Sequence, residues 1–572
     1  MNKLDRNYIF IALLGAAFFL PFLGGIHLFD WDEINFAECA REMILTGDYL
    51  RPRINFEPFW EKPPLFIWFQ TAAMQAFGVS EFSARLPNAV CGIATLLTIY
   101  HLGKKLYDKT FGWLWTLAYV GSILPHLYFK SGIIDPWFNF FIFLSLVFHI
   151  KNEEVASLKL QAEGNKPQAE SDKRQTASGD KPSIFSFSIT PYLLFAGLFS
   201  GFAILTKGPV GFLIVALTWL CKSLIYRELS LKKIVRFTAI ASVAVATAAI
   251  WFGVEILKNG FWFVNEFIIY NIRLAKTEDA GHGGFIGYHF VVLFFGCFPS
   301  SVFALRSILR GYSFVGEKVD FTRWMRILFL VVLVLFSLVQ SKIVHYSSMC
   351  YLPLTFLAAI SMKSWLDEGV KIPRFYKITV VVVGILLGSI VAAVPFLGQN
   401  IGVLKPLFQH DLFALKNLDA FVHWSGGEAA AGFVLILTVF LFFFIEKKGE
   451  ILRGLIFLFF GTAIFLQLVM LLFVGKIESY SQRAAIEFYE SKQAEDCYIT
   501  TFGFKSYAHL FYSRMRPPTN VKHADESFLL RGQVEKPTYI VGKITAKTAL
   551  DTLPSVQFLY EKNGFVFYHR LR

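Results

Sequence analysis

The chain has 572 residues, of which 55% are hydrophobic, 17% aromatic and 17% charged. An ordinary soluble protein carries about 25% charged residues, so this composition excludes a soluble globular, disordered, collagen-like or coiled-coil protein and predicts an integral membrane protein with some soluble mass attached. The net charge of +13 would suggest a nucleic-acid partner only if membrane topology did not already explain it.

Apolar stretches of about 20 residues, enough to cross a bilayer, recur along the chain. We predict thirteen spans, at residues 8–26, 82–101, 111–129, 135–150, 189–206, 208–226, 234–254, 286–306, 325–341, 344–362, 375–397, 429–446 and 453–475. The first stretch has no small-residue cleavage pattern after it, so we interpret it as a span rather than a signal peptide. Lys130 and Asp135 interrupt residues 111–150, which predicts two short helices with a tight reversal between them.

The loops between these spans differ in basic content. Loops on the side of the N-terminus hold 28 Lys and Arg residues, whereas the outer segments hold 12. The positive-inside rule then predicts a cytoplasmic N-terminus, and an odd number of spans places the C-terminal region outside. Topology therefore accounts for most of the basic excess, and we expect no nucleic-acid partner.

The soluble parts form two segments of different character. After a membrane domain over residues 1–476, residues 477–572 predict a small extracytoplasmic α/β domain. Its expected strands are 497–502, 538–542 and 565–569, and its expected helices are 481–494, 504–513 and 545–552. Residues 151–188 are rich in Lys, Glu, Gln, Ser and Ala, which predicts a disordered cytoplasmic loop.

The six cysteines do not form a disulfide framework. Cys39 and Cys497 stand in polar sequence, but nothing in their spacing demands a bridge. The sequence contains neither a CxxC nor an HExxH motif, so no self-contained metal motif is visible.

Residues 27–81 form a long outer loop that is dense in charged and aromatic residues. Apolar residues recur at helical spacing over 33–46, which predicts an amphipathic helix on the membrane surface, and 65–77 is a second candidate helix. Such a loop would form a roofed groove that holds a lipid head group while the tail stays in the bilayer.

Two aspartates are candidate functional groups, each with a structural alternative. Asp30 and Glu33 have the spacing of a capping box, so Asp30 or Asp32 could simply cap the next helix. Asp135 before Pro136 has the sequence of a helix N-cap. Asp135 also begins a membrane span, where an ionisable group is a functional candidate, and capping is compatible with catalysis.

Several basic residues fall at the outer edges of the predicted spans, namely Arg53, Lys62, Lys207, Arg273 and Lys342. Snorkelling would explain any one of them. Together at one face they predict a binding site for an anionic group such as a phosphate. Pro63 and Pro64 stiffen the chain beside Lys62 and would hold it in place.

The order of these residues resembles the first outer loop of bacterial polytopic glycosyltransferases, the lipid A aminoarabinose transferases and, more distantly, the protein O-mannosyltransferases. The motifs that carry the resemblance are Asp32-Glu33, Ala37-Glu38, Arg41-Glu42-Met43, Gly47-Asp48, Pro52-Arg53, Glu61-Lys62-Pro63-Pro64-Leu65 and Arg85-Leu86-Pro87. It continues through Asp135, Leu205 to Pro209 and Ser341-Lys342, with a weaker echo from Tyr480 to Pro518, and so covers nearly the whole chain.

The resemblance implies a GT-C fold in the bacterial inner membrane, with thirteen spans and an extracytoplasmic α/β domain. It implies a polyprenyl-phosphate sugar donor and a lipid or protein acceptor on the outer side. Asp32 matches the main catalytic carboxylate and Asp135 a second acidic position. Residues expected to bind the substrates are Glu33, Arg53, Glu61, Lys62, Lys207, Lys342 and Tyr346.

The resemblance also bears on cofactors. Family members can carry a divalent metal ion near the position of Glu61, and His282 would be its partner here; no other cofactor is implied. Three departures leave the sugar and the acceptor open: Asn35 stands where the aminoarabinose transferases usually have Arg, Phe56 stands where a Gly is usual, and residues 276–289 are only loosely similar.

The expected chemistry is direct displacement. A carboxylate would deprotonate the acceptor hydroxyl as general base, Lys and Arg would neutralise the departing phosphate, and the anomeric centre would invert. The main alternative is a transporter or flippase of a lipid-linked sugar, but such folds usually show two similar halves, and the charged loop occurs once. A non-catalytic sensor would leave that loop unexplained.

Overall fold

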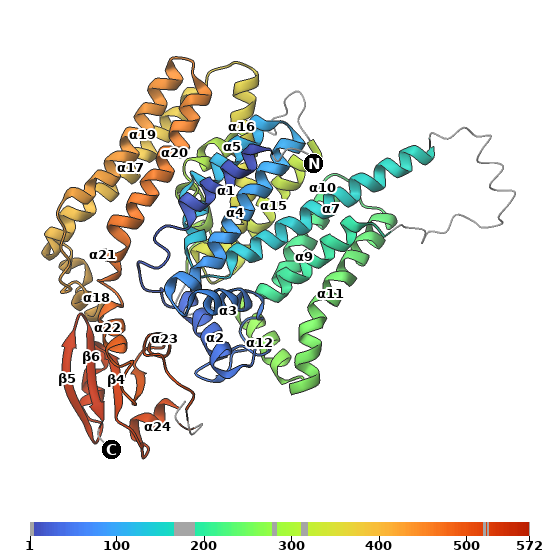
Figure 1. Cartoon of the computed structure of the whole chain (residues 1–572). Helices are drawn as coiled ribbons and strands as arrows, with labels where there is room; N and C mark the ends of the chain where they lie inside the picture. The colour runs from blue at the N-terminus through green and yellow to red at the C-terminus, as the bar shows by residue number, and fades with distance from the viewer. Residues whose placement is uncertain are drawn as a thin grey trace.

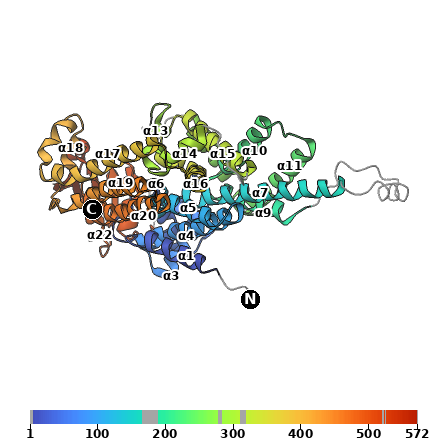
Figure 2. The same cartoon turned by 90° about the horizontal axis from the view of Figure 1, so that it is seen from above.

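The computed structural model describes residues 5–164, 189–276, 283–309, 319–518, 522 and 525–570. Helices form most of the molecule, and a small sheet lies at one end (Figure 1). Seen from above, α17, α19 and α20 lie at one end of an elongated bundle, α9, α10 and α11 at the other, and α4, α5 and α16 between them (Figure 2).

The elements of the membrane part are α1 (Arg6–Phe19), α2 (Asp32–Thr46), β1 (Arg53–Ile54), β2 (Glu57–Pro58), α3 (Leu65–Phe77), α4 (Glu81–Leu106), α5 (Lys109–Val120), α6 (Ile123–Leu127), η1 (Tyr128–Lys130), α7 (Asp135–Gly164), α9 (Pro191–Lys207), α10 (Val210–Ile225), α11 (Leu231–Asn259), α12 (Trp262–Lys276), α13 (Tyr288–Gly296), α14 (Ser300–Leu309), α15 (Val319–Leu338), η2 (Val344–Cys350), α16 (Tyr351–Asp367), α17 (Arg374–Gln399), α18 (Leu412–Asn417), α19 (Ala430–Lys447), α20 (Ile451–Val469) and α21 (Gly475–Glu478). The C-terminal part contains α22 (Arg483–Ser491), β3 (Tyr498–Phe502), α23 (Ala508–Tyr512), α24 (Glu526–Arg531), β4 (Thr538–Lys543), α25 (Lys547–Asp551), β5 (Val556–Lys562) and β6 (Phe565–Arg570).

The helical part has an integral membrane fold. Within the described residues, seven helices are long and apolar enough to cross a membrane, or eight if the bent α6–α7 pair counts as one span. Four further apolar helices are shorter: α1, α9, α10 and α14. α16 lies at the centre, with 94% of its apolar window buried, against 33% for α11 and α17. The thirteen predicted stretches each contain at least part of one of these helices, but the count of thirteen spans stays a prediction.

The expected reversal lies between η1 and α7, where the chain bends by 116°, but α7 has 30 residues and is not a short helix. The side-chain amide of Asn88 on α4 holds this turn, donating to the carbonyls of Ser131 (2.6 Å) and Ile133 (2.7 Å). The bend places Asp135 at the first residue of α7, close to the first outer loop.

Two expected boundaries are wrong. The stretch 286–306 is not one helix but the pair α13 and α14, which are separated around Pro299 because proline cannot donate the helical hydrogen bond. Residues 151–164, expected to be disordered, continue α7, because Ala, Leu, Glu and Lys are strong helix formers even without apolar partners. Residues 165–188 of that loop lie outside the described residues.

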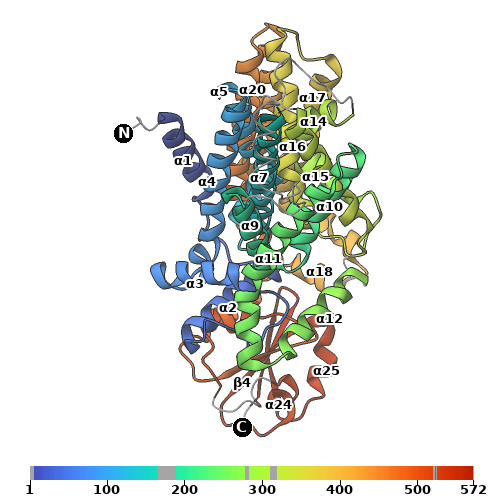
Figure 3. The same ribbon diagram turned by 90° about the vertical axis from the view of Figure 1, so that its right-hand side faces the viewer.

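The two helices predicted in the first outer loop are confirmed as α2 and α3, which lie between the helical bundle and the C-terminal sheet (Figure 3). However, α2 does not lie half-exposed on a membrane surface, because every residue from Glu33 to Met43 is buried. α3 packs on one side of it and α23 on another. The polar face survives burial because Arg41 pairs with Glu38 at 2.6 Å.

The strands β1 and β2 form a hairpin with a two-residue turn at Asn55 and Phe56. Both turn residues have positive φ, 57° and 62°, the combination of a type I′ turn that favours glycine or asparagine. Here the Phe56 backbone N–H donates to the buried carboxylate of Glu42 at 2.8 Å, which holds the hairpin on α2.

The C-terminal sheet has the strand order β3-β4-β6-β5. β3 pairs with β4 in parallel, and β4–β6 and β6–β5 are antiparallel. β3, β4 and β6 lie where the sequence predicts strands, whereas the exposed edge strand β5 and the short helix α24 were not predicted. Ile499, Val541 and Phe567 pack in one core with residues of α2 and α3, so the sheet and the first loop form a continuous unit.

The cysteines are all free. Cys39 is completely buried on α2, in the same core as Phe66 of α3, and Cys497 is partly buried at the start of β3. No Cys39–Cys497 bridge therefore forms.

Candidate active site

Two aspartates at the starts of separate helices meet at one histidine. His345 Nε2 lies 3.5 Å from Asp32 Oδ2 at the start of α2 and 3.8 Å from Asp135 Oδ2 at the start of α7. The side chain of Asp32 is 33% exposed and that of Asp135 is 3% exposed. The arrangement gives a pair of carboxylates, one facing open space and one enclosed.

The capping interpretation of the loop aspartates is wrong. The N-cap of α2 is Trp31, and among the described residues no side chain forms a cap bond there. Glu33 accepts from the N–H of Phe29 (2.8 Å), while the N–H of Asp30 donates to Gln482 (3.3 Å), so the reciprocal bonds of a capping box are absent from this part of the structure. The Asp32 carboxylate is therefore available for another partner.

Asp135 is held by Lys207. The Lys207 ammonium donates to Asp135 Oδ1 at 2.6 Å and lies 5.1 Å above the ring centre of Tyr346. Lys207 is the last residue of α9, and the chain turns there because Gly208 adopts φ 93°, which residues with a side chain rarely adopt, before Pro209. Buried Asp135 Oδ2 has no hydrogen-bond donor among the described residues and keeps an acceptor position toward His345.

Lys62 approaches the same group of charges from the first loop. Its ammonium lies 4.7 Å above the ring of Tyr270 on α12 and 3.4 Å from the phenol oxygen. Burial lowers the pKa of Lys62, the carboxylates of Glu61, Asp32 and Asp135 act in the opposite direction, and Lys207 adds to the lowering. A partly desolvated cation next to a second cation gains strongly from an anionic ligand.

His345 is the site residue that the sequence did not single out. It lies in η2, beside Tyr346, at the end of the Ser341-Lys342-Ile343-Val344 run. The usable signal was a titratable ring at the outer edge of an apolar span, where a polar group is a functional candidate. A single histidine has many structural explanations, so only its contact with both aspartates identifies it.

Glu33, predicted to bind substrate, accepts hydrogen bonds from four N–H donors in this structure. Its carboxylate accepts from Arg85 Nε (3.0 Å) and a second Arg85 nitrogen (2.8 Å), and from the N–H groups of Phe29 and Gly132. Burial alone would raise the pKa of Glu33, but Arg85 and the two N–H groups hold it below its ordinary value. This network ties the first loop to α4 and to the turn before α7.

The other predicted binding residues lie in different places. Arg53 contacts Asp48 at 3.3 Å on the outer side of the hairpin, and Lys342 donates to the carbonyls of Phe336 (3.3 Å), Ser337 (2.8 Å) and Val339 at the end of α15. Neither contact joins the aspartate site. Arg273 lies 5.3 Å from the ring of Tyr270, the same ring that Lys62 contacts.

The predicted metal position has limited support. Glu61 lies next to Lys62, and its charge contributes to the lowered acidity of Tyr507. His282 lies outside the described residues. Within the described part of the chain no three His, Cys, Asp or Glu side chains are grouped as metal ligands, and the Glu61–His282 pairing stays a prediction.

The sequence of this chain is similar to those of named transferases. The family model described as dolichyl-phosphate-mannose-protein mannosyltransferase matches residues 61–159, which include Lys62 and Asp135. The undecaprenyl phosphate-alpha-4-amino-4-deoxy-L-arabinose arabinosyl transferase of Pectobacterium atrosepticum is 23% identical over 438 residues, 74% of this chain and 71% of that protein. Its counterpart in Aeromonas hydrophila is 26% identical over 366 residues, 63% of this chain and 60% of that protein.

Solved structures agree at the level of the fold. The crystal structure of ArnT from Cupriavidus metallidurans bound to undecaprenyl phosphate superposes with a TM-score of 0.73 at 17% identity, covering 99% of both chains. The apo form of the same enzyme gives 0.71. The chain therefore has a polytopic GT-C membrane fold. The resemblance to the aminoarabinose transferases and the protein O-mannosyltransferases is confirmed.

Proposed function

We propose that this protein is a glycosyltransferase that moves a sugar from a polyprenyl-phosphate donor to a lipid acceptor. The observation that carries the proposal is the convergence of Asp32, Asp135, His345, Lys207 and Lys62 at one site. The relatives named as undecaprenyl-phosphate-aminoarabinose transferases, and the shared fold with an undecaprenyl-phosphate-bound enzyme, support the donor class.

Lys62 and Lys207 supply the charge that a phosphate donor requires. Both ammonium groups are partly desolvated against aromatic rings, and electrostatic contacts to a developing charge are stronger in such surroundings. When the glycosidic C–O bond breaks, the electron pair goes to the phosphate oxygen, and the two cations stabilise the polyprenyl phosphate that leaves. Lys207 is meanwhile positioned by Asp135.

Asp32 is the group we assign as general base. It is the more exposed of the two aspartates, and in the described parts of the chain no hydrogen bond engages it. In the proposed step Asp32 takes the proton of the acceptor hydroxyl, the hydroxyl oxygen forms a bond to the anomeric carbon, and the phosphate departs from the opposite side. The product therefore has the inverted anomeric configuration. His345, 3.5 Å away, positions the carboxylate and offers a path for the proton afterwards.

The proposal includes a topology. Counting α13 and α14 as one broken span and each predicted stretch as one crossing gives thirteen spans in the bacterial inner membrane. Residues 477–572 then form an extracytoplasmic domain, on the same side as the first loop. The sheet and α2 share a core, which supports their being on one side. A C-terminal reporter enzyme should be active only outside the cytoplasm; activity inside would overturn the topology.

The donor is tested with purified protein in detergent. Undecaprenyl-phosphate sugar as sole donor should support transfer, and a nucleotide sugar should not; turnover with the nucleotide sugar alone would overturn the donor assignment.

Mass spectrometry of envelope lipids and glycoproteins with and without the gene identifies the sugar and decides between a lipid A-like acceptor, which we favour, and a protein. Movement of the donor across vesicles without cleavage would favour a flippase instead.

A further inference from the structure

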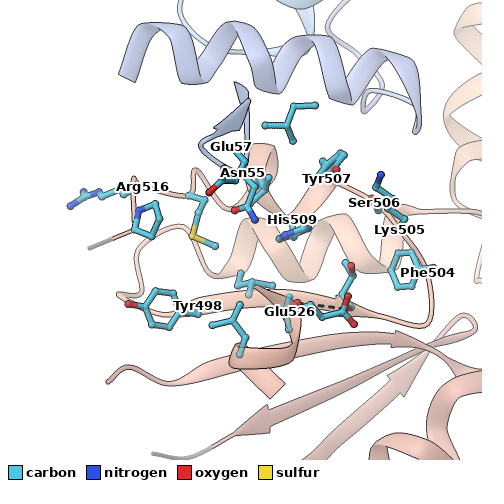
Figure 4. Close-up of a pocket in the computed structure, with 18 of the residues that line it drawn as sticks. Asn55, Glu57, Tyr498, Phe504, Lys505, Ser506, Tyr507, His509, Arg516 and Glu526 are labelled. Carbon is cyan, nitrogen blue, oxygen red and sulfur yellow. Dashed lines mark hydrogen bonds between the residues drawn. The ribbon is translucent and has the colours of Figure 1, made fainter. Parts of the chain in front are cut away.

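A cavity separate from the aspartate site lies between the first loop and the C-terminal sheet. It has a volume of about 610 Å³, within the usual range of small-molecule sites. The hairpin residues Asn55 and Glu57 form one side, Glu526 of α24 lies opposite, and Tyr507 and His509 lie between them (Figure 4). None of these residues takes part in the aspartate site.

The hairpin wall of this cavity is held firmly. The backbone N–H of Phe56 donates to Glu42 (2.8 Å), and the Phe56 carbonyl accepts from Arg53 (3.2 Å). Asn55 and Phe56 both adopt left-handed backbone conformations, so the turn presents Asn55 and Glu57 to the cavity in one orientation. The wall is therefore a preformed surface on α2.

The side of the cavity formed by residues 505–507 is in contact with the residues that precede Asp32. The ring of Tyr507 packs on Trp31 with a centroid distance of 5.3 Å, and Lys505 lies 5.0 Å above the Trp31 ring. The hydroxyl of Ser506 bonds to the Asp30 carboxylate. Burial raises the pKa of Tyr507 to about 12, with a contribution from Glu61. The cavity is thus next to Trp31, the residue before Asp32 at the start of α2.

The lining chemistry indicates the class of ligand. Aromatic faces (Tyr507 and Phe504) stand beside hydroxyl and amide groups (Thr500, Ser506 and Asn55). Burial lowers the pKa of His509 to about 4, so its ring is neutral and can both donate and accept a hydrogen bond. The charged lining residues balance, two carboxylates (Glu57 and Glu526) against two cations (Lys505 and Arg516). Balanced charge disfavours a nucleotide, and these polar groups disfavour a prenyl chain.

We propose that this cavity binds the saccharide head group of the acceptor glycolipid and so presents one of its hydroxyls to Asp32. Rings that stack on sugar faces, together with carboxylate and amide groups that bond hydroxyls, fit a hydroxyl-rich saccharide. This inference rests on the proposed glycosyltransferase function, and it names the C-terminal sheet and the β1–β2 hairpin as determinants of acceptor choice.

The kinetic test uses the purified full chain with undecaprenyl-phosphate sugar as donor and purified lipid A as acceptor. Glu526→Trp fills the cavity from the exposed first turn of α24 and should raise the acceptor KM at least tenfold, a change of about 1.4 kcal/mol or more, with the donor KM unchanged. Ser527→Trp, an exposed neighbour outside the lining, is the matched control and should behave as wild type. An unchanged acceptor KM in Glu526→Trp would overturn the proposal.

A direct binding test separates this inference from the proposed function. Saturation-transfer NMR on the full-length Asp32→Asn variant would use the deacylated glucosamine disaccharide of lipid A, with and without its phosphates. We expect a signal from both forms that Glu526→Trp abolishes. No signal in either protein, or one that Glu526→Trp leaves intact, would overturn the cavity assignment. Absence of transfer from every polyprenyl-phosphate donor, with the NMR signal present, would reject the proposed function and leave saccharide binding standing.

Discussion

Asp32 and Glu33 are neighbours at the start of α2, yet they belong to two different regions. Glu33 is 4% exposed and both of its oxygens are saturated, each accepting two hydrogen bonds from Arg85 or from backbone N–H groups. Asp32 has a 33% exposed side chain and a contact of 3.5 Å with His345. Both regions contain carboxylates and cations. The region around Asp32, the reactive one, therefore differs from the structural region around Glu33 in unused hydrogen-bonding capacity and not in charge.

The comparison predicts the largest effect for Asp32→Asn. The amide keeps the shape but cannot accept a proton, so transfer should fall by about 10²- to 10⁴-fold, while the melting temperature stays near that of wild type because no hydrogen bond to Asp32 is lost. Steady-state transfer and thermal unfolding in detergent measure the two quantities. Full turnover by well-folded Asp32→Asn would remove Asp32 from the catalytic role.

Glu33→Gln should show the reverse pattern. Removing the charge leaves the buried Arg85 guanidinium without its counter-ion, and breaking a buried pair in this way costs about 3–5 kcal/mol of stability. The purified variant should unfold at clearly lower temperature, and the fraction that remains folded should still transfer sugar. A stable but inactive Glu33→Gln protein would place Glu33 in the chemistry and contradict the distinction between the two regions.

Lys62→Ala tests how much the Lys62 cation contributes to donor binding in the reactive region. A hydrogen bond to a charged group contributes roughly 1.5–3 kcal/mol, so donor binding should weaken by about 10- to 150-fold. Lys405→Ala, in an exposed ion pair with Asp419, serves as the control and should leave donor binding unchanged. If Lys342 bound the phosphate, as the sequence predicts, Lys342→Ala would match Lys62→Ala. Its bonds to the end of α15 predict instead a loss of stability of about 1.5–3 kcal/mol.

The smallest expected effect is on how the melting temperature depends on pH, through the contact between His27 of the first loop and Glu478 of α21. Burial alone would lower the pKa of His27, but the hydrogen bond and charge of Glu478, 3.1 Å away, raise it above its ordinary value of 6.5. The stabilisation is therefore fully present below about pH 6.5 and is lost as the pH rises through the higher folded-state pKa. His27→Asn should flatten the decline in melting temperature between pH 6 and pH 8.5; an unchanged slope would assign that decline to another group.

Local patterns in the sequence predicted local structure well. Apolar length and periodicity predicted α2 and most of the long helices, and strand-like segments predicted three of the four strands in the C-terminal sheet. These patterns did not predict features that depend on contacts with residues distant in the sequence. The amphipathic pattern of α2 predicts a helix on the membrane surface, whereas the Glu38–Arg41 pair allows its polar face to be buried against α23. β5 was missed because its residues are exposed at a sheet edge.

The same limit applies to the site. Asp135 was a candidate because it begins an apolar span, Lys62 and Lys207 because several basic residues fall together at the outer edges of spans, and Asp32 because of the family resemblance. Which candidates meet depends on the packing of α2, α7, α9 and η2. That packing brings His345 into the site, whereas Arg53 and Lys342 bind residues close to them in the sequence. Residue type and position thus predicted the candidate residues, and only the tertiary fold shows which of them meet in one site.

The burial of Cys39 gives the protein a built-in reporter. Alkylating reagents attack the thiolate, and burial raises the pKa of Cys39 well above its ordinary value while α3 covers the side chain. Alkylation of Cys39 must therefore wait for α2 and α3 to separate, whereas the partly exposed Cys221 and Cys497 react first. The labelling rate of this native residue, followed by peptide mass spectrometry with and without lipid substrate, measures how often the segment bearing Asp32 and Lys62 opens.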